Sequence, residues 1–265
     1  MTSAAEQFAS NINLASFAKA EELKKRLLFT LGALIVYRLG TYIPIPGINP
    51  EAFAQQFQQQ QGGLLGTLNI FAGGAVERMA IFALNIMPYI SASIIMTLMT
   101  AVIPSLEAIK KEGEQGRRQI NQYTRYLTVF LATMQGYFIA VSLQSPAAAG
   151  GIPVVTSPGV FFIVTTVVTL VGGVMFLLWL GEQITARGVG NGVSLIIFAG
   201  IVAELPRAAA GLFALGRGTA AGGQTLPGGV VVLVMAIALA LIAFVVFVER
   251  SQRRLLVQYP RRQVG

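Results

Sequence analysis

The stretch Asn69–Thr97, NIFAGGAVERMAIFALNIMPYISASIIMT, joins an apolar run of helix length to a part that is unsuited to span a membrane. Its second half is apolar enough to lie in hydrocarbon, but a glycine pair at 73–74 and the charges of Glu77 and Arg78 interrupt the first half. Non-helical backbone at membrane depth is stable only where protein buries it or where it lines water. The stretch therefore predicts a short half-helix that folds back into a cavity, followed by a true span, in a chain that lines a pathway.

The composition of the 265 residues is that of a polytopic membrane protein. Hydrophobic residues make up 54% of the chain and charged residues 11%, and the mean hydropathy is +0.68. These values are far from those of a soluble domain. The chain has no Cys, His or Asp, which excludes disulfides, Cys/His metal sites, Ser-His-Asp triads and Asp-centred phosphoryl transfer. We expect no metal, no cofactor and no enzymatic activity.

Apolar runs near the length of about 20 residues that crosses a core of about 30 Å predict six spans. The expected spans are residues 27–42, 79–103, 123–143, 160–180, 193–210 and 230–248. The fifth is the weakest, because Glu204, Pro206 and Arg207 cut its apolar run short. Six spans place both chain ends on the same side of the membrane.

The basic residues predict which side that is. Fifteen of the 19 Lys and Arg residues lie before the first span, in the second and fourth connections, or in the tail. By the positive-inside rule these segments are cytoplasmic. Topogenic charges beside lipid headgroups explain most of the net charge of +8. Paired basic residues in the 107–125 loop and the tail could instead grip ribosomal RNA or an acidic partner, and composition leaves both interpretations open.

Four runs, in order along the chain, resemble the SecY family of protein-conducting channels. They are KKRLLFTLGALIVYRLGTYIPIPGI (24–48), IFALNIMPYISASII (81–95), EAIKKEGEQGRRQINQYTRY (107–126) and WLGEQITARGVGNGVSLIIFAGIV (179–202). The resemblance implies an all-α polytopic fold with six transmembrane helices and a re-entrant plug half-helix. These would form the first half of a pseudo-twofold channel together with its sixth span.

The resemblance also divides the chain into segments. Residues 1–26 would be a cytoplasmic amino-terminal segment, and 27–210 a first repeat of five spans with the plug at about 64–78. Residues 211–248 would be an external connection and the sixth span, and 249–265 the start of the cytoplasmic 6/7 loop. Because the later spans would lie beyond residue 265, we expect this chain not to conduct alone unless they are supplied in trans.

The function that the resemblance implies is a passive pore subunit of the Sec translocon in the bacterial inner membrane, with a cytoplasmic amino terminus. Unfolded secretory polypeptides would cross through it, and apolar segments would pass sideways into lipid. The implied partners are the SecE and SecG subunits, the SecA motor, the ribosome with its nascent polypeptide, and anionic lipids.

Matching motifs assign four groups of site residues by resemblance. The aliphatic pore ring would be Ile86, Ile90, Val193 and Ile197, and the plug would include Leu64, Gly66, Asn69, Phe71, Gly73 and Gly74. The lateral gate would include Ser91 and Thr97, and the ribosome or motor contact Arg253, Arg254, Arg261 and Arg262. From the residues alone, these aliphatic side chains are typical of ordinary helix packing. For the two hydroxyls a packing role, and for the glycine-rich segment an ordinary external loop, are equally open interpretations.

A small-solute secondary transporter is the rival class, because it also uses six-span halves and broken helices. Transporters carry a polar or ionisable cluster at the midplane, and residues 81–96 and 163–180 carry no such cluster. The glycines at 188, 190 and 192 lack the preceding strand and following Lys-Ser/Thr of a phosphate-binding loop, so we expect a tight turn there. Arg38 is expected to reach lipid headgroups or to pair with a carboxylate.

Overall fold

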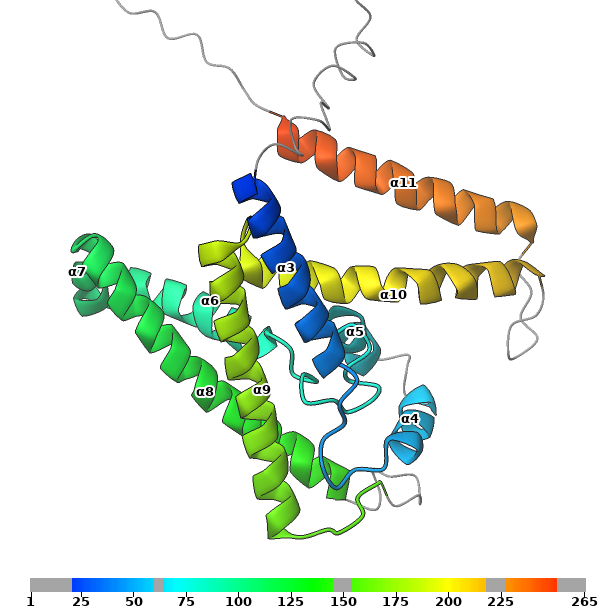
Figure 1. Cartoon of the computed structure of the whole chain (residues 1–265), viewed down its shortest axis with the longest axis horizontal. Coiled ribbons are helices and arrows are strands. Elements are labelled where there is room, and N and C mark those ends of the chain that lie inside the picture. Colours follow the sequence, from blue (N-terminus) through cyan, green and yellow to red (C-terminus); the bar gives the residue numbers. More distant parts are fainter. Residues whose placement is uncertain (1–20, 60–63, 145–153, 218–226, 252–265) are drawn as a thin grey trace, which may run out of the picture. The chain divides into compact units, whose positions relative to one another are not determined.

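The computed structural model describes residues 21–59, 64–144, 154–217 and 227–251. In these residues the structure is helical, and β structure is limited to two isolated bridges, Pro44 with Ala80 and Ile48 with Val155 (Figure 1). The all-α prediction is confirmed. The chain divides into two compact units, Met1–Glu204 and Leu205–Gly265, and each is described by itself.

The helices have the following bounds. They are α3 (Glu21–Gly40), α4 (Pro50–Gln59), α5 (Leu64–Phe71), α6 (Met87–Val102), α7 (Pro104–Lys111), α8 (Glu114–Gln144), α9 (Val160–Arg187), α10 (Gly192–Arg217) and α11 (Gly228–Arg250).

Four of the described helices, α8 to α11, are long and apolar enough to cross a membrane. A fifth span is added if α6 and α7, which meet at a bend of 99°, count as one broken span. Helix α3, which we predicted as the first span, falls outside this set. The apolar stretch of α3 is short, because Arg26 and Arg38 bound it. The total of six spans therefore stays a prediction.

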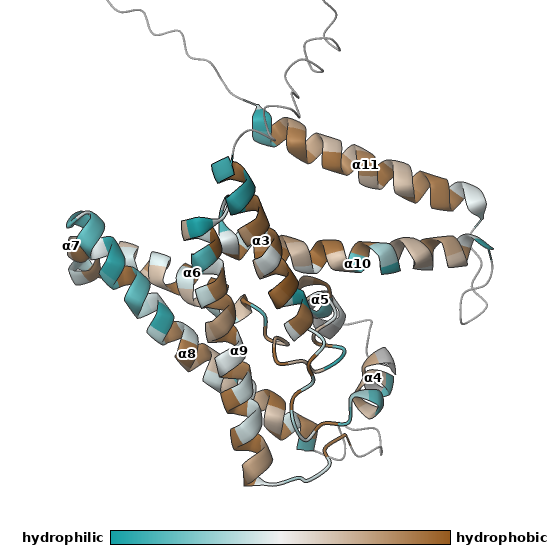
Figure 2. Ribbon diagram, in the orientation of Figure 1, coloured by the Kyte–Doolittle hydropathy of each residue, from teal (hydrophilic) through white to brown (hydrophobic). Residues whose placement is uncertain are grey.

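Helix α3 nevertheless has the two faces of a helix at a protein–lipid boundary. Its buried residues, spaced three or four apart, are Thr30, Ala33, Tyr37 and Gly40. Its large exposed residues include Leu28, Leu31, Ile35 and Leu39, which follow the same spacing. An exposed stripe that is wholly apolar fits a hydrocarbon environment better than water. Figure 2 shows the hydrophilic residues of α3 near its start and hydrophobic residues along most of the rest.

The first unit is held together by α8 and α9, which pack side by side (Figure 1). Helix α6 packs on α8, and α3 packs on α9. The buried face of α8 consists of small residues four apart: Thr124, Thr128, Ala132, Gly136 and Ala140. Small residues allow helix backbones to approach closely where the surrounding lipid provides no hydrophobic drive. A Cβ atom on Gly136 would already lie 3.6 Å from Leu170 of α9.

Two helices are longer than their predicted spans. Helix α8 begins at Glu114, so the segment expected as a cytoplasmic loop is largely helical. Helix α10 continues to Arg217 through Pro206, so the helix extends past residue 210, and the end of the span stays a prediction. A proline inside a helix removes one backbone hydrogen bond and crowds one carbonyl. The boundary between the two units, at Glu204–Leu205, lies beside this proline.

In the second unit, the end of α10 lies against the start of α11. A Cβ atom on Gly216 would be 3.0 Å from Val231, which is the buried residue of α11. The apolar window of α11 has a mean hydropathy of 3.3, and 6% of it is buried in the described structure. Figure 2 shows this hydrophobic surface over most of the helix.

Candidate functional site

Residues 72–86 connect α5 to α6 without forming a helix, although most of them are buried. Ala75 and Ala80 are fully buried, and the backbone forms a series of turns. We predicted that the second span begins at residue 79, and this is wrong, because α6 begins at Met87. Met79 and Asn85 have φ angles of +44° and +49°. This left-handed conformation is incompatible with a continuous α-helix.

The backbone of this segment finds hydrogen-bond partners in the connection after α3. The amide of Ile81 donates to the carbonyl of Ile43 at 2.9 Å, and the amide of Ile45 donates to the carbonyl of Met79 at 3.0 Å. Pro44 and Ala80 form the isolated bridge between these two bonds. Polar backbone at membrane depth requires such partners. The Ile-Pro-Ile-Pro run at 43–46 therefore supplies an edge on which the irregular segment docks.

Three glycines, one on each of three helices, make room for this segment. A Cβ atom on Gly40 of α3 would overlap the ring of Phe82, and one on Gly173 of α9 would overlap the carbonyl oxygen of Ile81. On Gly200 of α10, it would lie 2.6 Å from the carbonyl oxygen of Phe71. We name Gly40, Gly173 and Gly200 the glycine seat. Sequence reasoning missed it, because a seat glycine differs from other helix glycines only in what it contacts.

The short helix α5 corresponds to the half-helix that the sequence predicts, and Asn69 closes the turn that follows it. The buried Asn69 side chain accepts a hydrogen bond from the amide of Glu77 at 2.9 Å, and its carbonyl accepts one from the amide of Gly74 at 3.0 Å. Gly73 and Gly74 have φ angles of +63° and +79°, which glycine adopts without strain. That α5 and this turn form a movable plug stays a prediction.

Two side chains from other elements bind the carboxyl end of α5. Asn85 Nδ2 donates to the carbonyl of Phe71 at 2.7 Å, and Arg38 NH1 donates to the carbonyl of Gly73 at 2.6 Å. Arg38 is predicted to reach a headgroup or a carboxylate, and the structure shows its NH1 atom bound to the backbone. The Arg38 guanidinium also lies over the ring of Tyr42, 5.2 Å from its centre, and Arg78 lies 4.4 Å from the same ring.

Three of the four predicted ring residues meet in one apolar cluster. Ile86 is buried within it, and Ile90 and Val193 pack against it half-buried. Ile90 donates its amide to the Ile86 carbonyl at 3.1 Å, so these two residues are stacked one helical turn apart. Ile197 is half-buried outside this cluster, whereas its neighbour Ile196 is fully buried within it.

The two predicted gate residues, Ser91 and Thr97, are exposed on α6. The buried face of this helix includes Ala92, Met96 and Thr100. Ser91 and Thr97 are about 120° apart around the helix axis, from a pitch of 3.6 residues per turn. The Thr97 hydroxyl donates to the Ser93 carbonyl at 2.7 Å. It is therefore satisfied within its own helix.

The glycine-rich turn between α9 and α10 is tight, as predicted. Gly190 has a φ angle of +77°. The amide of Val189 donates to the Thr30 hydroxyl of α3 at 3.2 Å, and the amide of Gly192 donates to the Thr185 hydroxyl at 2.8 Å. The first bond joins the turn to the middle of α3, and the second joins it to the end of α9.

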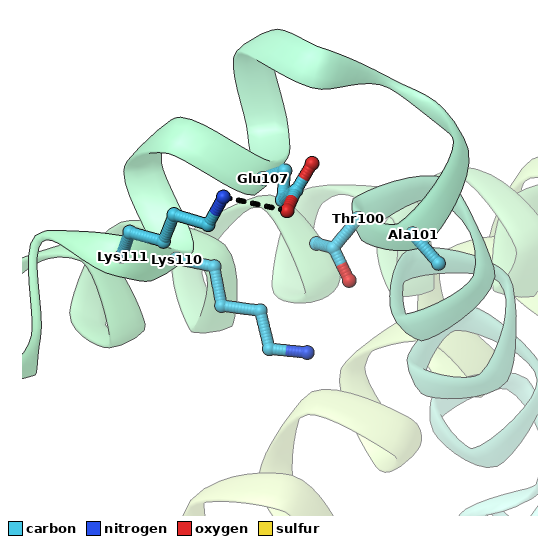
Figure 3. Close-up of a pocket in the computed structure, with 5 residues that line it drawn as sticks. All are labelled: Thr100, Ala101, Glu107, Lys110 and Lys111. Atoms are coloured by element: carbon cyan, nitrogen blue, oxygen red, sulfur yellow. Dashed lines mark ion pairs between the residues drawn. The ribbon is translucent and has the colours of Figure 1, made fainter.

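A polar hollow of about 460 Å³ lies at the bend between α6 and α7. Its lining residues are Thr100, Ala101, Glu107, Lys110 and Lys111. Figure 3 shows the ion pair of Glu107 with Lys111, whose atoms are 2.7 Å apart. Within the described residues, no group of three or more His, Cys, Asp or Glu side chains could hold a metal ion. The predicted contact residues Arg253, Arg254, Arg261 and Arg262 lie outside the described residues.

Comparison with known proteins gives a consistent result. The sequence model of the SecY family matches residues 80–265. Over 244 residues, 92% of this chain, it is 54% identical to the protein translocase subunit SecY of Pseudomonas aeruginosa and equally to that of Escherichia coli K12. These alignments cover 53% and 54% of the relatives, so the chain spans about half of their length.

A solved structure of Sec61 in the canine ribosome-channel complex from the endoplasmic reticulum shares the fold. Its TM-score is 0.56 at 17% identity, with 89% of this chain and 49% of that chain covered. Together with the apolar helices, these relationships make the chain a multi-pass membrane protein. The match of the family model to well over half of the chain shows that it belongs to the SecY family.

Proposed function

We propose that this chain contributes to the pore of a Sec translocon in the bacterial inner membrane. Unfolded secretory polypeptides would pass through the pore, and apolar segments would leave it sideways into lipid. The relatives are named protein translocase subunits, and the channel in the ribosome-channel complex has the same fold. Because the chain spans about half of its relatives, the whole channel's activity belongs to this proposal.

The observation that carries the proposal is the buried irregular segment 72–86 between a short helix and a span. This non-helical backbone packs against the three glycines of the glycine seat and pairs with the 43–46 edge. At its end, Ile86 lies in an apolar cluster, which also contains Tyr37 and Phe82, and Ile90 packs against that cluster. An aliphatic constriction closes a pore by excluding water, and it offers no binding site to the passing chain. A channel that must ignore the chemistry of its cargo requires this combination.

The proposal includes the orientation and the partners that follow from it. The basic connections and the amino terminus would be cytoplasmic, as the positive-inside rule predicts. The SecA motor or a translating ribosome would supply the energy, SecE and SecG would complete the channel, and anionic lipids would lie against the basic loops. We expect no catalytic residue in this chain.

Disulfide crosslinking tests the proposal, because the chain has no cysteine. We would introduce Ile90→Cys into the full-length protein, assemble it with its partner subunits, and stall a secretory precursor that carries a single cysteine. A disulfide between the two would place the precursor at the apolar cluster. Ile35→Cys is the matched control, because Ile35 lies on the apolar face of α3 and is 59% exposed.

Equal crosslinking of both positions, or of neither, would contradict the pore assignment of Ile90. The rival transporter class predicts a different result. Proteoliposomes that contain the protein would then show a saturable flux of a small solute, and no precursor crosslink would form at Ile90.

A further inference from the structure

We propose that Arg38 and Asn85 form a latch that holds the carboxyl end of α5 in place and sets how often this helix leaves its seat. The inference rests on the proposed function and on the assignment of α5 as the plug, which the family resemblance implies. It starts from two hydrogen bonds, Asn85 Nδ2 to the Phe71 carbonyl at 2.7 Å and Arg38 NH1 to the Gly73 carbonyl at 2.6 Å.

These bonds differ in kind from the others around α5. The bonds of Asn69 to Glu77 and Gly74 join residues 69–77 to one another, and they can persist when α5 and this turn move as a unit. Arg38 belongs to α3, and Asn85 lies at the far end of the irregular segment, beside the N-cap residue of α6. The helix cannot leave its seat while both of these bonds remain.

The end of α5 is also the place where such bonds have the greatest effect. The last carbonyls of a helix have no partner within it, and they carry its partial negative charge. Asn85 binds one of them, the Phe71 carbonyl. Arg38 binds the Gly73 carbonyl, two residues beyond the helix, through a charge-assisted hydrogen bond, which is stronger than one between neutral groups. The Phe71 carbonyl lies against Gly200 of the glycine seat, so the latch acts where α5 meets α10.

Both latch side chains are held in position by their own surroundings. Arg38 NH2 donates to the Tyr42 hydroxyl at 3.3 Å, and the guanidinium lies over the Tyr42 ring. Asn85 is 2% exposed, with a left-handed backbone. Preorganised donors lose little conformational entropy when they bind, which favours re-formation of the closed state.

A buried thiol measures how often the seat opens. Ala72 follows α5 directly and is 2% exposed, so Ala72→Cys would react with a water-soluble maleimide only when the segment leaves its seat. The measurement uses the full-length protein with its partner subunits in proteoliposomes, without a precursor. In this background, we expect Arg38→Gln to raise the labelling rate about tenfold, the effect of losing one charge-assisted bond.

Asn85→Gly is the second variant, because glycine keeps the left-handed backbone without strain and removes the side chain whose amide binds the Phe71 carbonyl. We expect a smaller increase than for Arg38→Gln, and a larger one when both are combined. Arg78→Gln is the comparison variant. Arg78 also lies over Tyr42, but its hydrogen bond, to the Gly74 carbonyl at 3.4 Å, stays within the turn that follows α5. We expect a smaller increase in its labelling rate than for either latch variant.

The outcomes separate the latch from the proposed function. An increase with Arg38→Gln and Asn85→Gly that exceeds the increase with Arg78→Gln supports the latch. If a translocating precursor exposes Cys at position 72 but neither variant changes the resting rate, the latch is wrong and the plug assignment stands. Equal effects of all three variants would also overturn the latch. If even a precursor leaves this thiol unreactive, the movable plug itself is wrong.

Discussion

Gly172 and Gly173 are neighbours in α9, but they have opposite surroundings. A Cβ atom on Gly172 would meet nothing within 4 Å, whereas one on Gly173 would overlap the Ile81 carbonyl. Gly173→Ala should therefore lower the stability of the folded protein by about 1–3 kcal/mol through overpacking. Gly172→Ala should be neutral or slightly stabilising, because alanine favours a helix by up to about 1 kcal/mol. Thermal unfolding of the two variants in detergent would measure the difference, and equal midpoints would contradict the glycine seat.

Ile86 and Ile197 were assigned to the same ring, but they differ in burial. Ile86 is 1% exposed, whereas Ile197 is half-buried outside the cluster. We expect Ile86→Ala to cost about 2–5 kcal/mol, because it leaves a cavity in packed surroundings. Ile197→Ala should cost less, because detergent or lipid can fill part of the space. Unfolding of both variants under one set of conditions checks this order, and a reversed order would place Ile197 in the packed core.

Helix α8 depends on one face of small residues. Ala132 is fully buried on the face that packs against α6 and α9, and the next residue, Thr133, is exposed. Ala132→Leu should separate the helices and destabilise the protein by about 1–3 kcal/mol. Thr133→Leu adds a similar volume toward lipid and should have little effect. The yield of folded protein by size-exclusion chromatography distinguishes the two variants, and similar yields would mean that α8 packs less closely than the structure shows.

At the level of the helices, the ion pair between α8 and α9 has little weight. Arg125 and Glu182 are 2.5 Å apart, and their side chains are 47% and 41% exposed. Exposed pairs contribute about 0–1 kcal/mol. The association of α8 with α9 therefore depends on its close-packed small residues.

At the scale of the whole molecule, the chain spans about half of its curated relatives. A half-channel would lack half of its constriction and half of its lateral gate. We therefore expect residues 1–265 to restore protein export, in cells depleted of their own channel, only when the remaining spans are co-expressed as a separate chain. Co-expression of the remaining spans alone is the control. Export supported by residues 1–265 alone would show that this chain suffices.

The sequence by itself determined the membrane class, the approximate positions of several helices and the break before α6. Hydropathy and the glycine and charge interruption at 73–78 are properties of neighbouring residues, so they can be read along the chain. The short half-helix α5 was predicted for the same reason. The family resemblance was also available from short runs of residues, and the comparisons confirm it.

Only the tertiary structure decided where the irregular segment ends, which glycines admit it and what Arg38 binds. Residues 79–86 are apolar enough for a helix, but they form turns, and the backbone of residues 79–81 pairs with the 43–46 edge. Gly173 differs from Gly172 only through a carbonyl that is distant in sequence. Arg38 and Gly73 are 35 residues apart. Such contacts depend on which segments meet in space, and the local pattern of residues carries no record of that.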